Sequence, residues 1–95
     1  MNWDTDILHK EDVAVEVLEE STDLRNLVVY NDDVNTFDHV IDTLIKVCGH
    51  TAEQAEQCTL LIHYKGKCTV KVGSYEELEG MCTALHDKAL SANIE

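Results

Sequence analysis

The stretch LVVYNDDVNTFDHVI, residues 27–41, decides the fold. Its first four residues are apolar and include two β-branched valines, which predicts a short strand. The polar run NDD at 31–33 predicts a turn, because Asn and Asp side chains bond readily to nearby backbone groups. From Phe37 onward the apolar residues follow the 3.6-residue spacing of a helix, with Asn35 or Thr36 placed to cap its first turn. A strand therefore passes into a helix through an acidic turn.

The rest of the chain carries further helix and strand signals. Gly49 ends the first helix, and the capping boxes TAEQ at 51–54 and SYEE at 74–77 open two more. Residues 67–72 alternate between apolar and cationic or polar side chains, which predicts a half-buried strand with one cationic face. Residues 90–94 predict a last short strand. The order is β-α-α-β-α-β. We therefore expect an α/β (α+β) domain, a short antiparallel sheet with three helices packed on one face.

The charge of the chain excludes several classes of partner. Its 95 residues include 19 acidic and 7 basic side chains, a formal net charge of −12. Phosphate binding needs clustered basic residues, so we expect neither nucleic acid nor an anionic membrane as a partner. The first residues lack the pattern of a secretory or transit peptide, which favours the cytoplasm. Residues 1–23 carry eight of the acids and one lysine, so we interpret them as a flexible acidic N-terminal extension and 24–95 as the folded domain.

The four cysteines are Cys48, Cys58, Cys68 and Cys82, and none forms the C-x-x-C pair of a structural zinc site. Most fall on apolar helix faces, so we predict reduced core residues and no metal or other cofactor. A catalytic pair of Cys58 with His63 is the enzymatic alternative. Its cysteine falls on the predicted core face, with no glycine-rich turn nearby to stabilise an oxyanion. We therefore predict that the protein is not an enzyme.

Two polar features have both a structural and a functional interpretation. The Asn31-Asp32-Asp33 run consists of ordinary turn residues, and acids before a helix complement its dipole. The same three side chains are all hydrogen-bond acceptors, so they are also a candidate receptor for a cation. His63 follows an apolar run, where a histidine is more often a partly buried structural residue than a ligand-binding one.

Several short motifs together strongly resemble the ClpS adaptor family. They are VYNDD at 29–33, TFDHVI at 36–41, AEQ at 55–57 and LIHYKGK at 61–67. Their spacing nearly matches that of the family, and the resemblance covers residues 24–95. It implies a bacterial adaptor that binds proteins with a large hydrophobic N-terminal residue (Leu, Phe, Tyr or Trp), the signal called an N-degron. The adaptor would deliver them to a Clp AAA+ unfoldase and its ClpP peptidase. We expect a monomer in the cytoplasm.

The resemblance also implies residue roles. Asn31, Asp33 and His63 match the family residues that hold the free α-amino group, with Asp32 a nearby acid. Glu76 falls on the surface that contacts the N-terminal domain of the unfoldase, and residues 1–23 match an extension used in substrate hand-off. The expected side-chain pocket is lined by Tyr30, Asn35, Phe37, Val40, Thr59, Ile62 and Leu90.

Three positions depart from the family pattern. The family often has Met where this chain has Phe37 and Thr59, so the preference among Leu, Phe, Tyr and Trp stays open. Thr36 replaces a common proline before the first helix. The alternatives to an N-degron adaptor are a general interaction module of the ribosomal-stalk C-terminal type and the small Cys/His enzyme considered above.

Overall fold

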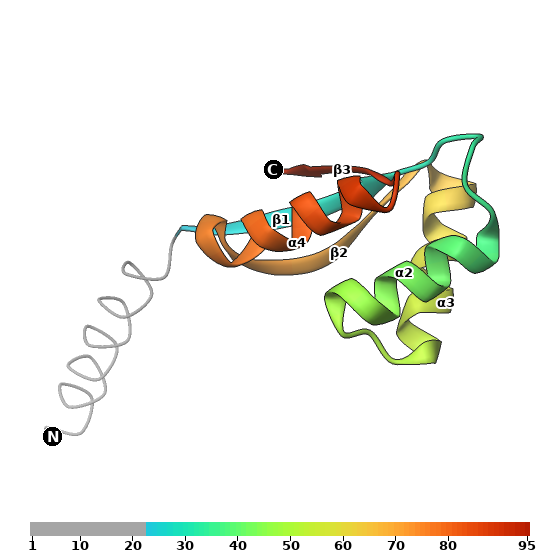
Figure 1. Cartoon of the computed structure of the whole chain (residues 1–95), viewed down its shortest axis with the longest axis horizontal. Coiled ribbons are helices and arrows are strands. Elements are labelled where there is room, and N and C mark those ends of the chain that lie inside the picture. The colour runs from blue at the N-terminus through green and yellow to red at the C-terminus, as the bar shows by residue number, and fades with distance from the viewer. Residues whose placement is uncertain (1–22) are drawn as a thin grey trace, which may run out of the picture.

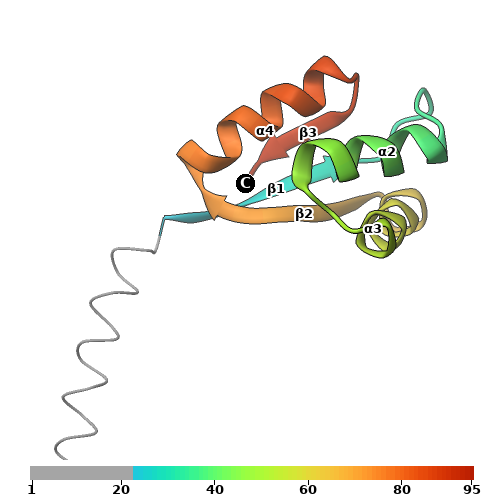
Figure 2. The same cartoon turned by 60° about the horizontal axis from the view of Figure 1, so that its bottom comes forward.

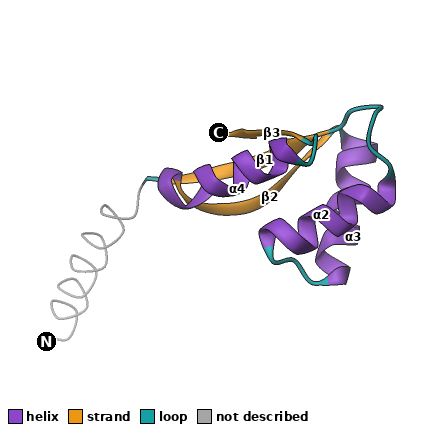
Figure 3. Cartoon of the chain, in the orientation of Figure 1, coloured by secondary structure: helices purple, strands orange, loops and turns teal. Residues whose placement is uncertain are grey.

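A strand with neighbours on both edges organises the fold. The computed structural model describes residues 23–95, and its sheet has three antiparallel strands in the order β2-β1-β3 (Figure 1). The elements in chain order are β1 (Leu24–Tyr30), α2 (Phe37–Cys48), α3 (Ala52–Lys65), β2 (Lys67–Ser74), α4 (Tyr75–Asp87) and β3 (Ser91–Ile94). This order is the predicted β-α-α-β-α-β, and Figure 3 shows that only short loops join the elements.

The predicted capping residues fix the helix ends. The Thr36 hydroxyl accepts the backbone N–H of His39 at 3.1 Å at the start of α2, and the helix ends at Gly49. Gly49 has φ 70°, a left-handed conformation that favours glycine. Both predicted capping boxes are confirmed: Thr51 and Ser74 each bond reciprocally with the residue three positions later.

All three helices pack against the same face of the sheet. Leu27 and Val29 of β1 point into the core, while α4 lies along β3, α3 lies beside β2 and α2 lies between them (Figure 2). The buried helix residues that meet this face are Val40, Leu44 and Cys48 of α2, Ala55 and Ile62 of α3, and Leu78, Cys82 and Leu85 of α4. The predicted arrangement of three helices on one face is therefore confirmed. No helix within residues 23–95 is long and apolar enough to cross a membrane.

A β-bulge corrects the predicted alternation along β2. Leu27 pairs with Lys71 and Val28 with Thr69, so Val70 is an extra residue with no partner on β1. Beyond the bulge the two faces exchange. The Lys71 ammonium donates to the backbone carbonyl of Cys48 at 3.4 Å. A cation at this position stabilises the C-terminus of α2, because the helix dipole is negative there. Val72 is turned outward and is 56% exposed. The expectation of a buried Val72 and a single cationic face was wrong, because alternation assumes a regular strand.

The cysteines lie in the core or against it as free thiols. Cys48 and Cys82 are buried, and Cys58 and Cys68 are partly buried. Burial raises the pKa of Cys48 to about 11. Burial, together with the neighbouring Cys58 thiol, raises the pKa of Cys68 to about 12. Burial also raises the pKa of Cys82. The thiolate forms of Cys48, Cys68 and Cys82 are therefore scarce at neutral pH, and the thiolate is the reactive species.

Replacing Leu44 with Ala should destabilise the domain by about 2–5 kcal/mol, because the side chain is fully buried and its loss leaves a cavity. The matched control is Leu61→Ala on α3, where the side chain is 44% exposed and the expected cost is below about 1 kcal/mol. Urea unfolding followed by circular dichroism measures both. Equal costs would mean that α2 does not pack as described.

Alkylation of the folded protein by iodoacetamide near neutral pH should leave Cys48 largely unmodified, because the thiol is buried and its pKa is raised to about 11. Unfolding in urea removes both protections, so the rate at Cys48 should rise by at least tenfold. Mass spectrometry of the digested protein gives the rate at each cysteine. A native rate at Cys48 equal to the unfolded rate would contradict the packing of α2 against the sheet.

Candidate functional site

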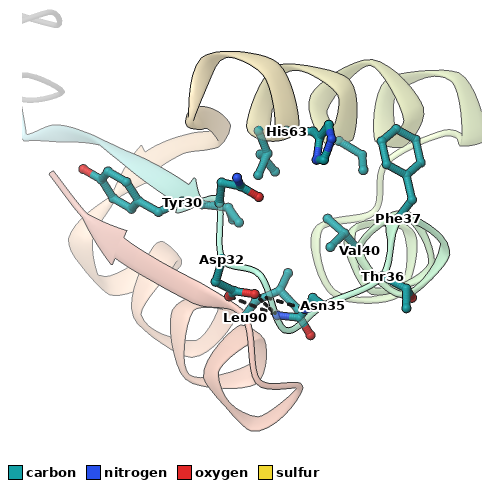
Figure 4. A pocket seen from close by; sticks show the side chains of 12 residues that line it. Tyr30, Asp32, Asn35, Thr36, Phe37, Val40, His63 and Leu90 are labelled. Carbon is teal, nitrogen blue, oxygen red and sulfur yellow. Dashed lines mark hydrogen bonds between the residues drawn. The ribbon is translucent and has the colours of Figure 1, made fainter.

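A small cavity of about 140 Å³ opens where β1 ends and the chain passes into α2 (Figure 4). Five segments meet there: the end of β1, the loop into α2, the start of α2, one face of α3 and the loop before β3. The lining residues are Val29, Tyr30, Asn31, Asp32, Asn35, Thr36, Phe37, Val40, Thr59, Ile62, His63 and Leu90. All seven residues of the predicted side-chain pocket are among them.

The interior of the cavity is apolar. Val29, Val40, Ile62 and Leu90 are all buried. Thr59 is also buried, and its hydroxyl donates to the backbone carbonyl of Ala55 at 2.7 Å, so the hydroxyl proton is already paired within α3. Because polar groups left unpaired in such a space would be costly, these walls suit a hydrocarbon or aromatic side chain.

Phe37 stands at the mouth of the cavity. Its side chain is 37% exposed, and its ring meets the His63 ring edge-to-face at a centroid separation of 6.1 Å. His63 in turn packs edge-to-face against Tyr64 at 5.1 Å. These contacts hold the imidazole over the opening, where Figure 4 shows it on the side of α3.

Asn31 supplies a second polar group to the lining of the cavity. Its backbone N–H donates to the carbonyl of Gly66 at 2.9 Å, which ties the end of β1 to the end of α3. Within residues 23–95, no hydrogen bond engages the side chain of Asn31 or His63. The carboxamide oxygen and one imidazole nitrogen are therefore acceptors available to a ligand.

The two carboxylates of the NDD run lie in different environments. Asp32 accepts the backbone N–H groups of Val34 and Asn35, each at 3.1 Å, and the hydroxyl of Ser91 at 3.1 Å. Partial burial raises the pKa of Asp32, but these hydrogen bonds outweigh it and the net pKa lies below its usual value. Asp33 is exposed on the same loop and is not among the lining residues.

Of the four residues expected at the amino group, Asn31 and His63 thus meet at the cavity with free acceptors. The Asp32 carboxylate borders the cavity but is engaged within the loop. Asp33 adds negative charge nearby without lining the opening.

Tyr30 contributes to the cavity differently from the expectation. Its ring points away from the other labelled side chains (Figure 4), its hydroxyl donates to the Glu95 carboxylate, and Lys67 lies 5.9 Å from the ring centroid. Successive side chains of a strand point to opposite faces of the sheet. Because Val29 faces the core, the Tyr30 ring faces the other side. For the same reason the inward-facing Val29 lines the cavity, a residue that the sequence analysis left out of the pocket. Thr36 also lines the cavity. It was not predicted there, because its sequence position indicates only a helix cap.

Glu76 lies at the other end of the sheet from the cavity. It is an exposed residue in the first turn of α4, which begins beside Ser74, and Ser74 pairs with Leu24 at the start of β1. The cavity adjoins Tyr30 at the end of the same strand. The expected ligand site and the expected unfoldase contact are therefore on separate surfaces. The extension of residues 1–23 lies almost wholly outside the described residues.

The described residues do not assemble the enzymatic alternative. Cys58 lines a different groove, together with His50, Thr69 and Val70, whereas His63 lines the cavity. No thiol–imidazole pair is formed between them. Within residues 23–95 there is also no group of three or more His, Cys, Asp or Glu side chains that could hold a metal ion.

Comparisons with known proteins agree with this fold. The chain matches the family described as ATP-dependent Clp protease adaptor protein ClpS over residues 20–93. A ClpS adapter of Synechocystis sp. is 43% identical over 54 residues, 56% of this chain and 55% of that protein, so the match spans about half of the relative. A ClpS adapter of Thermosynechococcus vestitus is 36% identical over 69 residues, 72% of this chain and 69% of that protein.

A solved structure shares the fold. The structure of Agrobacterium tumefaciens ClpS2 bound to L-phenylalaninamide aligns with a TM-score of 0.71 at 20% identity, covering 77% of this chain and 95% of that one. Because the family match extends over most of the chain, from β1 through α4 and into β3, this chain belongs to the ClpS family of Clp protease adaptor proteins.

Proposed function

We propose that this ClpS-family chain binds proteins through a large hydrophobic N-terminal residue and delivers them to a Clp AAA+ unfoldase and its ClpP peptidase. The observation that carries the proposal is the cavity at the end of β1, an apolar dead end whose mouth holds free acceptors of Asn31 and His63. The family consists of adaptors, so we propose no catalytic step for this chain.

The chemistry of a protein N-terminus fits this arrangement. An N-terminal residue differs from an internal one by its ammonium group, which carries N–H donors and a positive charge. A reader of N-terminal residues therefore needs acceptors beside a pocket for one side chain. Hydrogen bonds to a charged group contribute roughly 1.5–3 kcal/mol each, and burial of one large apolar side chain contributes about as much. After the entropy of association is subtracted, we expect micromolar or somewhat tighter binding.

A solved relative supports the ligand class. The ligand named for the A. tumefaciens protein, L-phenylalaninamide, has a free amine next to an aromatic side chain. That combination matches the polar mouth and apolar interior of the cavity in this chain. The negative charge of the chain, −12 overall, also favours a cationic ligand group.

Delivery is assigned to surfaces away from the cavity. Glu76, exposed at the start of α4, is the proposed contact with the N-terminal domain of the unfoldase. The acidic residues 1–23 are the proposed hand-off segment. We place this activity in the bacterial cytoplasm and expect the adaptor to act as a monomer.

A peptide that starts with Phe should bind, and its N-terminally acetylated twin should bind at least tenfold more weakly, because acetylation removes the positive charge and two of the N–H donors. His63→Ala should raise the dissociation constant of the free peptide about tenfold or more, since an acceptor is lost. Asp33→Asn should have a smaller effect that fades with added salt, because Asp33 is exposed and acts through its charge. Isothermal titration calorimetry measures all of these.

Glu76→Ala is the matched control, because it removes a carboxylate of the opposite end of the sheet. It should leave the peptide affinity unchanged and weaken binding of the isolated unfoldase N-terminal domain. Equal affinity for free and acetylated peptides would contradict the proposal and favour a general interaction module. Thermal unfolding of each variant shows whether a loss of binding reflects a loss of fold.

Thr59→Met should shift the preference of the pocket toward smaller side chains. Thr59 is a buried wall residue, and the larger Met side chain would occupy part of a cavity of only about 140 Å³. We expect peptides starting with Trp or Tyr to lose more affinity than a peptide starting with Leu. A competition series of otherwise identical peptides measures the ranking, and an unchanged ranking would show that Thr59 does not contact the ligand.

A further inference from the structure

The loop between α4 and β3 forms one wall of the cavity. It carries Leu90, which is only 4% exposed and lines the cavity on the side away from His63 (Figure 4). The backbone N–H of Leu90 donates to the carbonyl of Leu85 at 3.0 Å, which ties this wall to the end of α4. Its position depends further on what holds the carbonyls of Lys88 and Ala89, just before it.

Two side chains near the start of α2 bind these carbonyls. His39 Nε2 lies 2.8 Å from the carbonyl oxygen of Lys88, and Asn35 Nδ2 donates to the carbonyl oxygen of Ala89 at 2.8 Å. A carbonyl oxygen only accepts, so Nε2 carries the proton of the His39 ring. His39 does not line the cavity itself, and the sequence analysis gave it no role.

Asn35 is oriented by Asp32. The Asn35 amide nitrogen also donates to both carboxylate oxygens of Asp32 at 3.0 Å, and the same carboxylate accepts the Ser91 hydroxyl from the far side of the loop. The Asp32 carboxylate thus joins the NDD turn to Ser91 directly and to Ala89 through Asn35. These contacts satisfy the amide donors and fix the direction in which Asn35 points.

The backbone of the loop shows that it needs such support. Ala89 has φ 68°, the one residue other than glycine within residues 23–95 with a positive φ. Left-handed backbone is unfavourable for an L-residue with a Cβ atom, so the surrounding contacts must hold it. The N–H groups of Ala89 and Leu90 donate to the carbonyls of His86 and Leu85 at 2.8 and 3.0 Å, the usual bonding of a left-handed helix end. The bonds from His39 and Asn35 to the carbonyls of Lys88 and Ala89 add a second constraint from outside α4.

We propose that Asn35 and His39, with Asp32 behind them, form a clasp that sets the position of Leu90 and thereby the depth and selectivity of the pocket. His39 is a positioning residue, because it does not line the cavity and acts on a ligand through the Leu90 wall, whereas Asn35 also lines the cavity itself. The selectivity part of this inference rests on the proposed N-terminal residue binding, whereas the clasp itself does not. The clasp also explains why the Asp32 carboxylate bonds within the loop and not at the mouth of the cavity.

Hydrogen exchange tests the clasp without any ligand. In His39→Ala and Asn35→Ala, backbone amides of residues 88–92 should exchange at least about threefold faster than in the parent, because one anchor of the loop is lost. His39→Gln should restore the parent rate, since the Gln amide nitrogen can replace Nε2 as a donor. Asn35→Asp should be worse than Asn35→Ala, because it keeps the shape but directs an acceptor at the Asp32 carboxylate and the Ala89 carbonyl.

Peptide binding then tests the effect on the pocket. We expect His39→Ala to raise the dissociation constant about two- to tenfold for a Phe-starting peptide and less for a Leu-starting one, because the longer side chain reaches the displaced wall. The ratio between free and acetylated peptides should stay at the parent value, which a general loss of fold would not preserve. Asp38→Ala, an exposed neighbour on α2, is the control and should change neither measurement.

Unchanged exchange at residues 88–92 in both alanine variants would overturn the clasp. Faster exchange with identical losses for Phe- and Leu-starting peptides would overturn its role in selectivity. If the parent protein binds neither peptide, the proposed function fails, and the exchange measurement still decides whether the clasp exists.

Discussion

The fold depends on the burial of one face of β1. This strand is hydrogen-bonded on both edges, and Leu27 and Val29 form the surface on which all three helices converge. The cavity begins where this strand ends, so its first residues are anchored by a strand that is hydrogen-bonded on both edges. The proposed recognition of an ammonium group needs acceptors held in fixed positions, and a central strand supplies that rigidity.

The adjacent carboxylates of the NDD run show how local contacts assign roles. Asp32 and Asp33 are chemically identical, yet only Asp32 lies within reach of two backbone N–H groups and the Ser91 hydroxyl. Those donors lower its pKa and occupy its lone pairs, which makes it a structural residue of the loop. Asp33, one residue further along, faces solvent and keeps its lone pairs free for water or a ligand.

Local sequence signals predicted the helices and strands well. Features that depend on contacts between distant residues could not be predicted. The capping boxes at Thr51 and Ser74 act within four residues, so the sequence alone locates both helix starts. The bulge at Val70 could not be predicted, because it depends on register against β1. The bonds of Asn35 and His39 to the loop before β3 join residues about fifty positions apart. No sequence spacing announces such a contact, so the roles of both residues emerge only in three dimensions.

The placement of the two proposed surfaces indicates how an adaptor of this kind would work. The cavity and Glu76 lie at opposite ends of β1, a strand of seven residues that spans roughly 20 Å. A strand bonded on both sides and packed by three helices is a poor carrier of conformational change, because a shift would break its pairing and its packing together. Delivery through these surfaces would therefore rest on tethering, in which the bound substrate gains a high effective concentration near the unfoldase. Under that arrangement the two surfaces can be altered independently, because neither shares a side chain or a loop with the other.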